Sequence, residues 1–162
     1  MKKSCLVTGS FDPFTIGHLD IAIRAAKIFD TVYIALLNNP YKKCFFTVEE
    51  RIAIAQKAVE NNKKIEVVSF DGMTVELAKK LKVNYLVRGI RNDADYTYEY
   101  EMAEYNSQNG GVETVCYFTD KKYNAVSSTE VRKNLAIGES IKDMVAPNTV
   151  ALIEELYRGR LK

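Results

Sequence analysis

The chain has 162 residues, 47% of them hydrophobic and 27% charged, with a formal net charge of +2. This length suits one domain with a substantial core, expected over residues 1–162, and the composition argues against a disordered chain. The small net charge does not suggest a nucleic-acid-binding or membrane-surface protein.

Three cysteines and a single histidine limit the chemistry further. Cys5, Cys44 and Cys116 form no Cys-x-x-Cys pair, so we expect reduced thiols in a cytoplasmic protein rather than a disulfide framework. With one histidine, a histidine-rich zinc site is not expected. The apolar run behind Met1 is too short for a secretory signal, and no apolar stretch has the length of a membrane span.

The first predicted strand, Cys5–Val7, leads into a turn that ends at a helix start. The strand breaks at Gly9, the turn passes through Asp12-Pro13, and regular structure resumes at Gly17-His18. A strand-to-helix turn of this kind exposes backbone N–H groups beside a helix N-terminus, which favours a bound phosphate.

The segments that follow alternate between helical and strand patterns. Apolar spacing predicts a helix over 19–29, and Thr47 with Glu50 forms a capping-box signature for the next helix. Further strands are expected at 31–37, 65–70, 84–87 and 112–118, and further helices at 47–62, 73–81, 94–107, 127–135 and 149–158.

Five strands alternating with helices predict an α/β fold. Right-handed crossovers favour a Rossmann-like, doubly wound, five-stranded parallel sheet, followed here by C-terminal helices. Such folds bind ligands beyond the carboxyl ends of their strands. Polar segments follow every predicted strand, at 9–18, 38–43, 71–74, 88–91 and 119–129, and this convergence predicts the place of the site.

His18 and Ser10 are the first candidates for phosphate binding. At a helix N-terminus, His18 can donate a hydrogen bond to a phosphoryl oxygen while Ser10 and nearby backbone N–H groups bind another. The alternative is a histidine that bonds only the backbone of its own helix start. The turn fits neither Gly-x-Gly-x-x-Gly nor Gly-x-x-x-x-Gly-Lys-[Ser/Thr], which argues against a dinucleotide oxidoreductase, a P-loop NTPase and a kinase.

Three cations follow other predicted strands. Lys42 lies in the loop after the second strand, and Arg88 and Arg91 come after the fourth. Paired guanidinium groups suit a phosphate ligand. The alternatives are a solvated lysine, and arginines that pair with nearby carboxylates such as Asp95 and Glu99.

Ser127, Ser128 and Thr129 precede another helix, where their hydroxyl and N–H groups suit the far end of a polyphosphate and also form an ordinary N-cap. Glu99 is a candidate for a nucleotide hydroxyl or amine, or for a helix surface. No carboxylate cluster resembles a protein metal cage, so Mg²⁺ is expected to arrive with nucleotide phosphates. No Ser-His-Asp or Cys-His arrangement is readable, which disfavours a covalent intermediate.

Two motifs carry a resemblance to a known superfamily. Thr15-Ile16-Gly17-His18 resembles the Thr/His-x-Gly-His motif of the nucleotidylyltransferases, and residues 126–132, Val-Ser-Ser-Thr-Glu-Val-Arg, are similar to their Ile-Ser-Ser-Thr-x-x-Arg segment. Together with residues 9–13, 41–43, 46–51, 88–91 and 95–103, they resemble the bacterial phosphopantetheine adenylyltransferases over nearly the whole chain.

The resemblance implies transfer of the adenylyl group of ATP to 4′-phosphopantetheine, giving dephospho-coenzyme A and pyrophosphate by direct attack of the acceptor phosphate. It implies His18, Lys42 and Arg91 as catalytic residues. The implied acceptor ligands are Ser10, Lys42, Thr74 and Arg88, and the implied ATP ligands are Ser10, Phe11, His18, Gly89, Ile90, Arg91, Glu99, Tyr123, Asn124, Ala125, Val126, Ser127, Ser128 and Thr129.

The same resemblance implies dependence on Mg²⁺, a cytoplasmic homohexamer and feedback by coenzyme A. Two related alternatives are a nicotinamide-mononucleotide adenylyltransferase and a glycerol-phosphate cytidylyltransferase, which favour His-x-Gly-His where this chain has Thr15. An alternative of another class is a nucleotide-binding regulator without turnover, which is expected to lose His18, Lys42 or Arg91.

Overall fold

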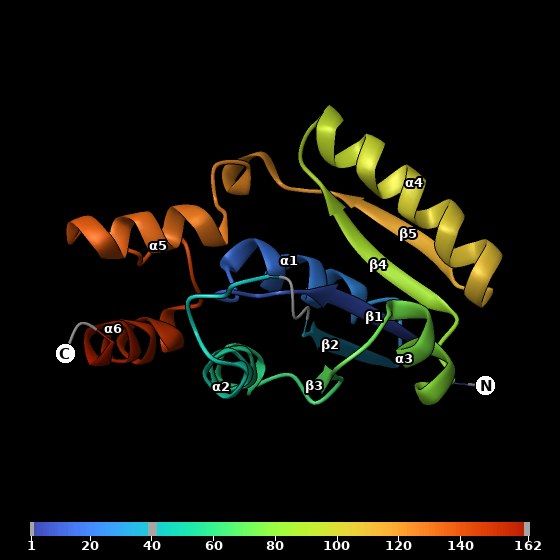
Figure 1. The fold of residues 1–162 in the computed structure, drawn as a ribbon, viewed down its shortest axis with the longest axis horizontal. Helices are drawn as coiled ribbons and strands as arrows, with labels where there is room; N and C mark the ends of the chain where they lie inside the picture. The colour runs from blue at the N-terminus through green and yellow to red at the C-terminus, as the bar shows by residue number, and fades with distance from the viewer. Residues whose placement is uncertain (1, 39–41, 161–162) are drawn as a thin grey trace.

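The computed structural model describes residues 2–38 and 42–160 and contains a five-stranded, all-parallel sheet (Figure 1). Its strands are β1 (Ser4–Gly9), β2 (Thr31–Leu37), β3 (Ile65–Phe70), β4 (Tyr85–Ile90) and β5 (Glu113–Phe118), in the order β3-β2-β1-β4-β5. The predicted Rossmann-like α/β fold is confirmed. Residues 39–41, which include Pro40 and Tyr41 of the predicted loop, lie outside the described residues.

Helices cover both faces of the sheet. They are α1 (Ile16–Ala25), α2 (Val48–Val59), α3 (Thr74–Leu81), α4 (Asp93–Gly110), α5 (Ser128–Ile137) and α6 (Val150–Gly159), with short 3₁₀ helices η1 (Lys121–Tyr123) and η2 (Pro147–Thr149). One buried cluster contains residues of α1, α2, α5 and α6, and a second contains residues of α3. None of the described helices is long and apolar enough to cross a membrane.

Strand β1 shows why the sheet is covered twice. Its successive side chains point to opposite faces, so Cys5 and Val7 lie in the first cluster and Leu6 in the second. All three are at most 5% exposed, as expected of a parallel strand buried on both faces. The three cysteines of the chain are free.

The prediction of a strand over 84–87 was too short at its carboxyl end. Strand β4 continues through Ile90, because residues 88–90 form a backbone ladder with residues 116–118 of β5. Arg88 therefore lies within the strand, and Arg91 is the first residue beyond it.

Several predicted helix ends also needed correction. The helix predicted over 19–29 begins at Ile16 and ends at Ala25, because Thr15 is its N-cap and His18 completes a capping box. The helix predicted over 94–107 continues to Gly110 and stops where Gly111 adopts a φ of +62°. The predicted capping box of Thr47 and Glu50 is confirmed at α2.

The order of the strands places a topological switch point between β1 and β4. From β1 the chain proceeds outward to β2 and β3, and from β4 it proceeds in the opposite direction to β5. The crevice beyond the carboxyl ends of two such strands is where ligands bind in doubly wound folds. Gly9 ends β1 and Ile90 ends β4, so the Gly9–His18 turn and Arg91 lie at this crevice.

Candidate active site

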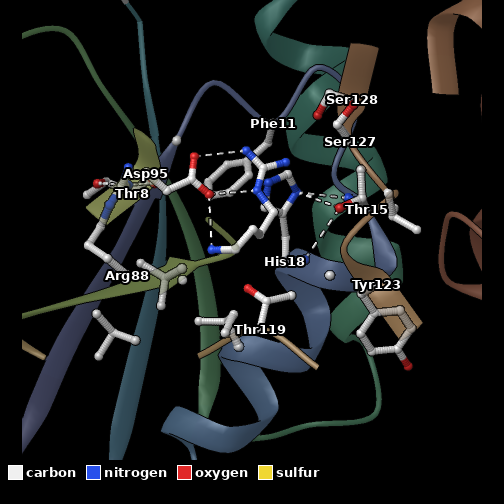
Figure 2. A pocket seen from close by; sticks show the side chains of 18 of the residues that line it. Thr8, Phe11, Thr15, His18, Arg88, Asp95, Thr119, Tyr123, Ser127 and Ser128 are labelled. Atoms are coloured by element: carbon white, nitrogen blue, oxygen red, sulfur yellow. Dashed lines mark hydrogen bonds and ion pairs between the residues drawn. The ribbon is translucent and has the colours of Figure 1, made fainter. Parts of the chain in front are cut away.

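A cavity of about 390 Å³ lies at the switch point. It is lined by the ends of β1 and β4, the start of α1, the start of α4 and the start of α5. In Figure 2, Thr8, Arg88 and Asp95 lie on one side of the view, Thr15, Tyr123, Ser127 and Ser128 on the other, and His18 between them. Thr8 and Ser128, which are 120 residues apart in sequence, thus share one cavity.

His18 is held by the capping box at the start of α1. The backbone N–H of Thr15 donates to His18 Nδ1 at 3.0 Å, so Nδ1 is an acceptor. The neutral ring must then carry its hydrogen on Nε2, and Nε2 has no acceptor within the described part of the chain. His18 lines the cavity, so its N–H is available to a ligand there. The helix-start role of His18 and a ligand role are therefore compatible, because they use different nitrogens.

The surroundings of His18 keep its ring neutral. Burial is the largest cause, followed by the positive charges of Arg88 and Arg91, and together they lower the pKa of His18 to about 4. At neutral pH the ring is a hydrogen-bond donor without a charge. This chemistry suits stabilisation of a phosphoryl oxygen by donation rather than by proton transfer.

The turn after β1 brings the Phe11 ring close to Gly9. A Cβ atom on Gly9 would lie 2.8 Å from the Phe11 ring, so a side chain there would force the ring to move. Phe11 itself has φ +48°, an uncommon conformation for a bulky residue. Within the described residues, the backbone N–H groups of Ser10 and Phe11 donate to no protein acceptor. Such N–H groups need a partner, which an anionic ligand can supply.

Three carbonyl oxygens of the same turn are bound by donors from other elements. Arg51 of α2 donates to the Ser10 carbonyl at 2.6 Å, and Ser128 donates to the Pro13 carbonyl at 2.8 Å. Arg132 of α5 donates to the Asp12 carbonyl and forms an ion pair with its carboxylate at 3.4 Å. Three carbonyl acceptors of the turn are thus occupied by protein groups, whereas the N–H groups of Ser10 and Phe11 are not.

A second helix N-terminus, that of α5, meets the same cavity. Ser127 is its N-cap and accepts a hydrogen bond from the Glu130 N–H at 3.1 Å. The N–H groups of Ser128 and Thr129 have no acceptor in the described ranges. The partial positive charge of a helix start, with free N–H groups, favours an anion.

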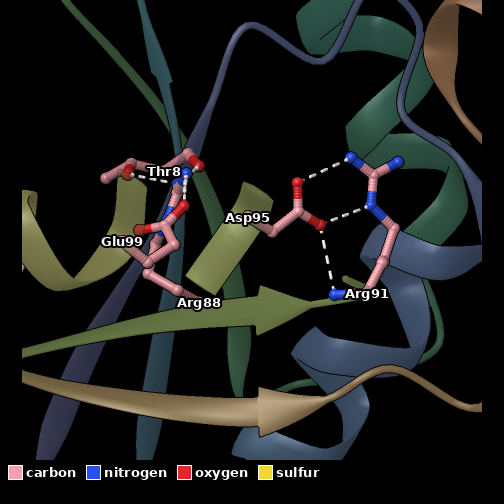
Figure 3. A network of polar contacts seen from close by, with 5 residues as sticks. All are labelled: Thr8, Arg88, Arg91, Asp95 and Glu99. Atoms are coloured by element: carbon pink, nitrogen blue, oxygen red, sulfur yellow. Dashed lines mark hydrogen bonds and ion pairs between the residues drawn. The ribbon is translucent and has the colours of Figure 1, made fainter. Parts of the chain in front are cut away.

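Arg88 is bound on all of its nitrogens by neighbouring protein groups (Figure 3). Its Nε and Nη2 donate to Glu99 at 2.8 and 2.6 Å, and its Nη1 donates to the Thr8 carbonyl and hydroxyl. Glu99 is 6% exposed. The buried carboxylate is therefore neutralised by the arginine at the end of β4, and the predicted pairing alternative describes the arrangement seen.

Arg91 makes a looser pair with Asp95 (Figure 3). Its Nε and Nη2 donate to the carboxylate at 2.9 and 3.2 Å, and the same carboxylate accepts the Arg91 backbone N–H at 3.1 Å. Hydrogen bonding from Arg91 holds the pKa of Asp95 below its ordinary value. Nη1 donates to no group among the described residues, so Arg91 retains donors for an additional anion.

A second cavity, of about 210 Å³, adjoins the first. All four predicted acceptor ligands, Ser10, Lys42, Thr74 and Arg88, line it. Both cavities are bounded by a shared wall made of Thr8, Gly9, Arg88, Tyr98 and Glu99.

The structure brings most, not all, of the predicted nucleotide ligands to the first cavity. Phe11, His18, Gly89, Arg91, Glu99, Tyr123, Val126, Ser127 and Ser128 line it, whereas Ser10 lines the second cavity and Ile90, Asn124, Ala125 and Thr129 line neither. The sequence did not identify Thr8, Arg51 or Arg132. It indicated Asp95 as a partner of an arginine but not as a residue that lines the cavity. Arg51 and Arg132 lie within segments 46–51 and 126–132, which carry the family resemblance, and this is the signal that points to them.

Comparison of the sequence with protein-family models agrees with this geometry. The model of the family described as cytidylyltransferase-like matches residues 6–134, from β1 into α5. The match includes His18, Arg88, Arg91 and the N-terminal ends of α1 and α5. Because it spans most of the chain, this protein belongs to the cytidylyltransferase-like family.

Proposed function

We propose that this protein is a nucleotidyltransferase that transfers the adenylyl group of ATP to 4′-phosphopantetheine, with dephospho-coenzyme A and pyrophosphate as products. The observation that carries the proposal is the pair of cavities that share one wall at Gly9 and Arg88. Two phosphate-bearing ligands, one in each cavity, would meet at these shared residues with their phosphates next to each other. The family match supports nucleotidyl transfer in general.

The lining of the second cavity supports an acceptor with an extended, partly apolar chain. Lys42 and Arg88 supply positive charge for a phosphate, and Leu37, Leu86 and Met102 add apolar surface to the lining. A small polar acceptor such as glycerol phosphate would leave these apolar side chains without a partner. Phosphopantetheine has both a phosphate and a long chain, and Thr15 in place of a first histidine of the motif also favours it.

In the proposed reaction an oxygen of the acceptor phosphate attacks the α-phosphorus of ATP directly. A new P–O bond forms, the bond from the α-phosphorus to the bridging oxygen breaks, and pyrophosphate leaves with the electron pair. His18 would donate its Nε2 hydrogen to the transferring phosphoryl group, and Lys42 and Arg91 would balance its negative charge. The free N–H groups of Ser10, Phe11 and the α5 start would hold the phosphates of ATP.

Magnesium is part of the proposal as an ion that the nucleotide brings. The two carboxylates that line the first cavity, Asp95 and Glu99, are both paired with arginines. In the described parts of the chain there is no group of three or more metal-ligating side chains. The residues present therefore do not form a protein magnesium site, and the ion would be held by phosphates and water.

The decisive experiment compares acceptors. The protein is incubated with Mg²⁺ and either ATP or CTP, and with phosphopantetheine, nicotinamide mononucleotide or glycerol phosphate, while pyrophosphate release is measured. We expect release with ATP and phosphopantetheine alone. Release with another pair would replace the proposed substrates, and nucleotide binding without release would favour a regulator.

The first variant to test is His18→Ala. We expect it to retain nucleotide binding and to lose turnover by about two orders of magnitude or more, the scale for removal of a preorganised donor. Calorimetry with ATP serves as the binding control. Unchanged turnover would remove His18 from the mechanism.

The proposal includes a cytoplasmic homohexamer that coenzyme A inhibits. The long helix α4 supports an assembly, because Tyr96 and Tyr100 are more than half exposed on it. Light scattering of the purified protein measures the number of subunits, and pyrophosphate assays with added coenzyme A measure the feedback.

A further inference from the structure

Arg51 is a buried cation to which the proposed reaction gives no role. It is 2% exposed, although it lies on α2, outside both cavities. Within the described residues it forms no ion pair, and it donates to two backbone carbonyls instead. Its Nε donates to Thr47 at 3.3 Å and its Nη1 to Ser10 at 2.6 Å. A guanidinium without a carboxylate is seldom buried this far, so these contacts need an explanation.

The Ser10 carbonyl belongs to the same peptide unit as the Phe11 N–H. In a planar, trans peptide these two groups point in opposite directions, and the Ser10–Phe11 bond is trans. When Arg51 binds the carbonyl from the α2 side, the Phe11 N–H is directed away from α2. Phe11 lines the first cavity, and its N–H has no acceptor among the residues described.

The conformation of Phe11 shows that this peptide needs to be held. A φ of +48° is costly for a bulky side chain and persists only where the surroundings fix it. Rotation of the Ser10–Phe11 peptide plane would relieve this conformation and would turn a carbonyl oxygen toward bound phosphate. A carbonyl oxygen in that place would repel the ligand that an N–H binds.

We propose that Arg51 is a positioning residue for the nucleotide: its grip on the Ser10 carbonyl keeps the Phe11 N–H directed at a nucleotide phosphate. The inference rests on the proposed nucleotide binding in the first cavity and is independent of which acceptor is used. Arg132 and Ser128 hold the next carbonyls of the turn, but Arg132 is also neutralised by Asp12. Of the two arginines that bind this turn, only Arg51 has no carboxylate partner among the described residues.

The test is the dissociation constant for Mg²⁺-ATP, and for Mg²⁺-CTP, measured by calorimetry without an acceptor. A lysine keeps the charge but lacks the fork that reaches both carbonyls. We expect Arg51→Lys to weaken nucleotide binding about tenfold, the loss of roughly one hydrogen bond from a charged group, and Arg51→Met to weaken it further. In amide NMR spectra, the nucleotide-induced shift of the Phe11 N–H is expected in the unaltered protein and lost in Arg51→Lys.

Ile54→Val is the matched control. Ile54 is fully buried on the same helix and touches neither cavity, so this variant lowers the melting temperature without acting on the turn. A purely structural Arg51 would change nucleotide affinity no more than this control does. Weakening beyond about threefold relative to Ile54→Val supports the inference, and a smaller change in folded Arg51→Lys overturns it. If Arg51→Met does not fold, the lysine variant decides.

The design separates this inference from the proposed reaction. A protein that binds nucleotide but releases no pyrophosphate with phosphopantetheine would refute the proposed acceptor and leave the Arg51 measurement intact. Unaltered protein that binds neither ATP nor CTP would overturn both.

Discussion

Arg88 and Arg91 stand three residues apart at the end of one strand, yet the protein uses them differently. Arg88 lies within β4, donates from all three nitrogens, and pairs with a glutamate whose side chain is 7% exposed. Arg91 lies beyond the strand, pairs with Asp95 one helical turn away in sequence, and has a side chain that is 38% exposed.

The contrast separates a structural arginine, Arg88, from one that is available to bind a ligand, Arg91. Arg88 joins β4 to β1 through Thr8 and to α4 through Glu99, so it fixes three elements of the cavity wall. Arg91 keeps Nη1 available for a ligand. Because exposed ion pairs are weak, Arg91 can leave Asp95 for a phosphate at a small cost in free energy. A phosphate is thus expected to meet Arg88 as a fixed charge and Arg91 as a movable fork.

The largest expected difference between the two arginines is in the free energy of unfolding after each one's carboxylate partner is removed. Glu99→Ala leaves Arg88 partly buried without its partner and should lower the free energy of unfolding by about 3 kcal/mol. Asp95→Ala removes an exposed pair and should cost no more than about 1 kcal/mol. Urea denaturation measures both. Equal losses would show that the two arginines are equivalent in the fold.

Arg91 should matter more for turnover than for the stability of the fold. Arg91→Lys keeps a charge but loses the planar fork, and we expect kcat to fall about tenfold or more. The free energy of unfolding should change by less than about 0.5 kcal/mol, as for most surface substitutions. Steady-state pyrophosphate assays together with urea denaturation measure the two quantities. A stable enzyme with unaltered kcat would contradict a role for the fork.

His18 reports on both arginines through its protonation. Its ring proton resonances in NMR should titrate near pH 4, because burial and the two positive charges lower its pKa to about 4. An unfolded histidine has a pKa near 6.5, so between about pH 6.5 and 4 the unfolded chain binds a proton that the folded protein does not. Stability from this group is therefore present above about pH 6.5 and is lost as pH falls through that window. Titration near 6.5 in the folded protein would mean that the ring is solvated.

The smallest expected effect tests the electrostatic share alone. Arg91→Gln removes one of the two charges and should raise the pKa of His18 only slightly, because burial is the larger cause. The same NMR titration measures it, with Lys133→Gln on the exposed α5 surface as the control. A shift beyond about one unit would make charge, rather than burial, the dominant cause.

The local features of the site were accessible to prediction because they depend on short-range patterns. The strand 31–37, the capping box at Thr47 and the Ser127 helix start were all correctly predicted. The error at β4 fell where tertiary contacts decide, because the strand gained three residues from pairing with β5. The error at α1 was local, because its first turn comes from the Thr15 cap, which the apolar spacing did not indicate.

The sequence by itself determined the α/β class, the polar segments at the strand ends and the residues of the motif that ends at His18, because periodicity and turn chemistry are local. Only the tertiary structure decided that Arg88 joins Thr8 of β1 to Glu99 of α4, and that Arg51 reaches Ser10 across 41 residues. Those outcomes depend on side chains from separate elements meeting at one edge of the sheet, which no spacing along the chain specifies.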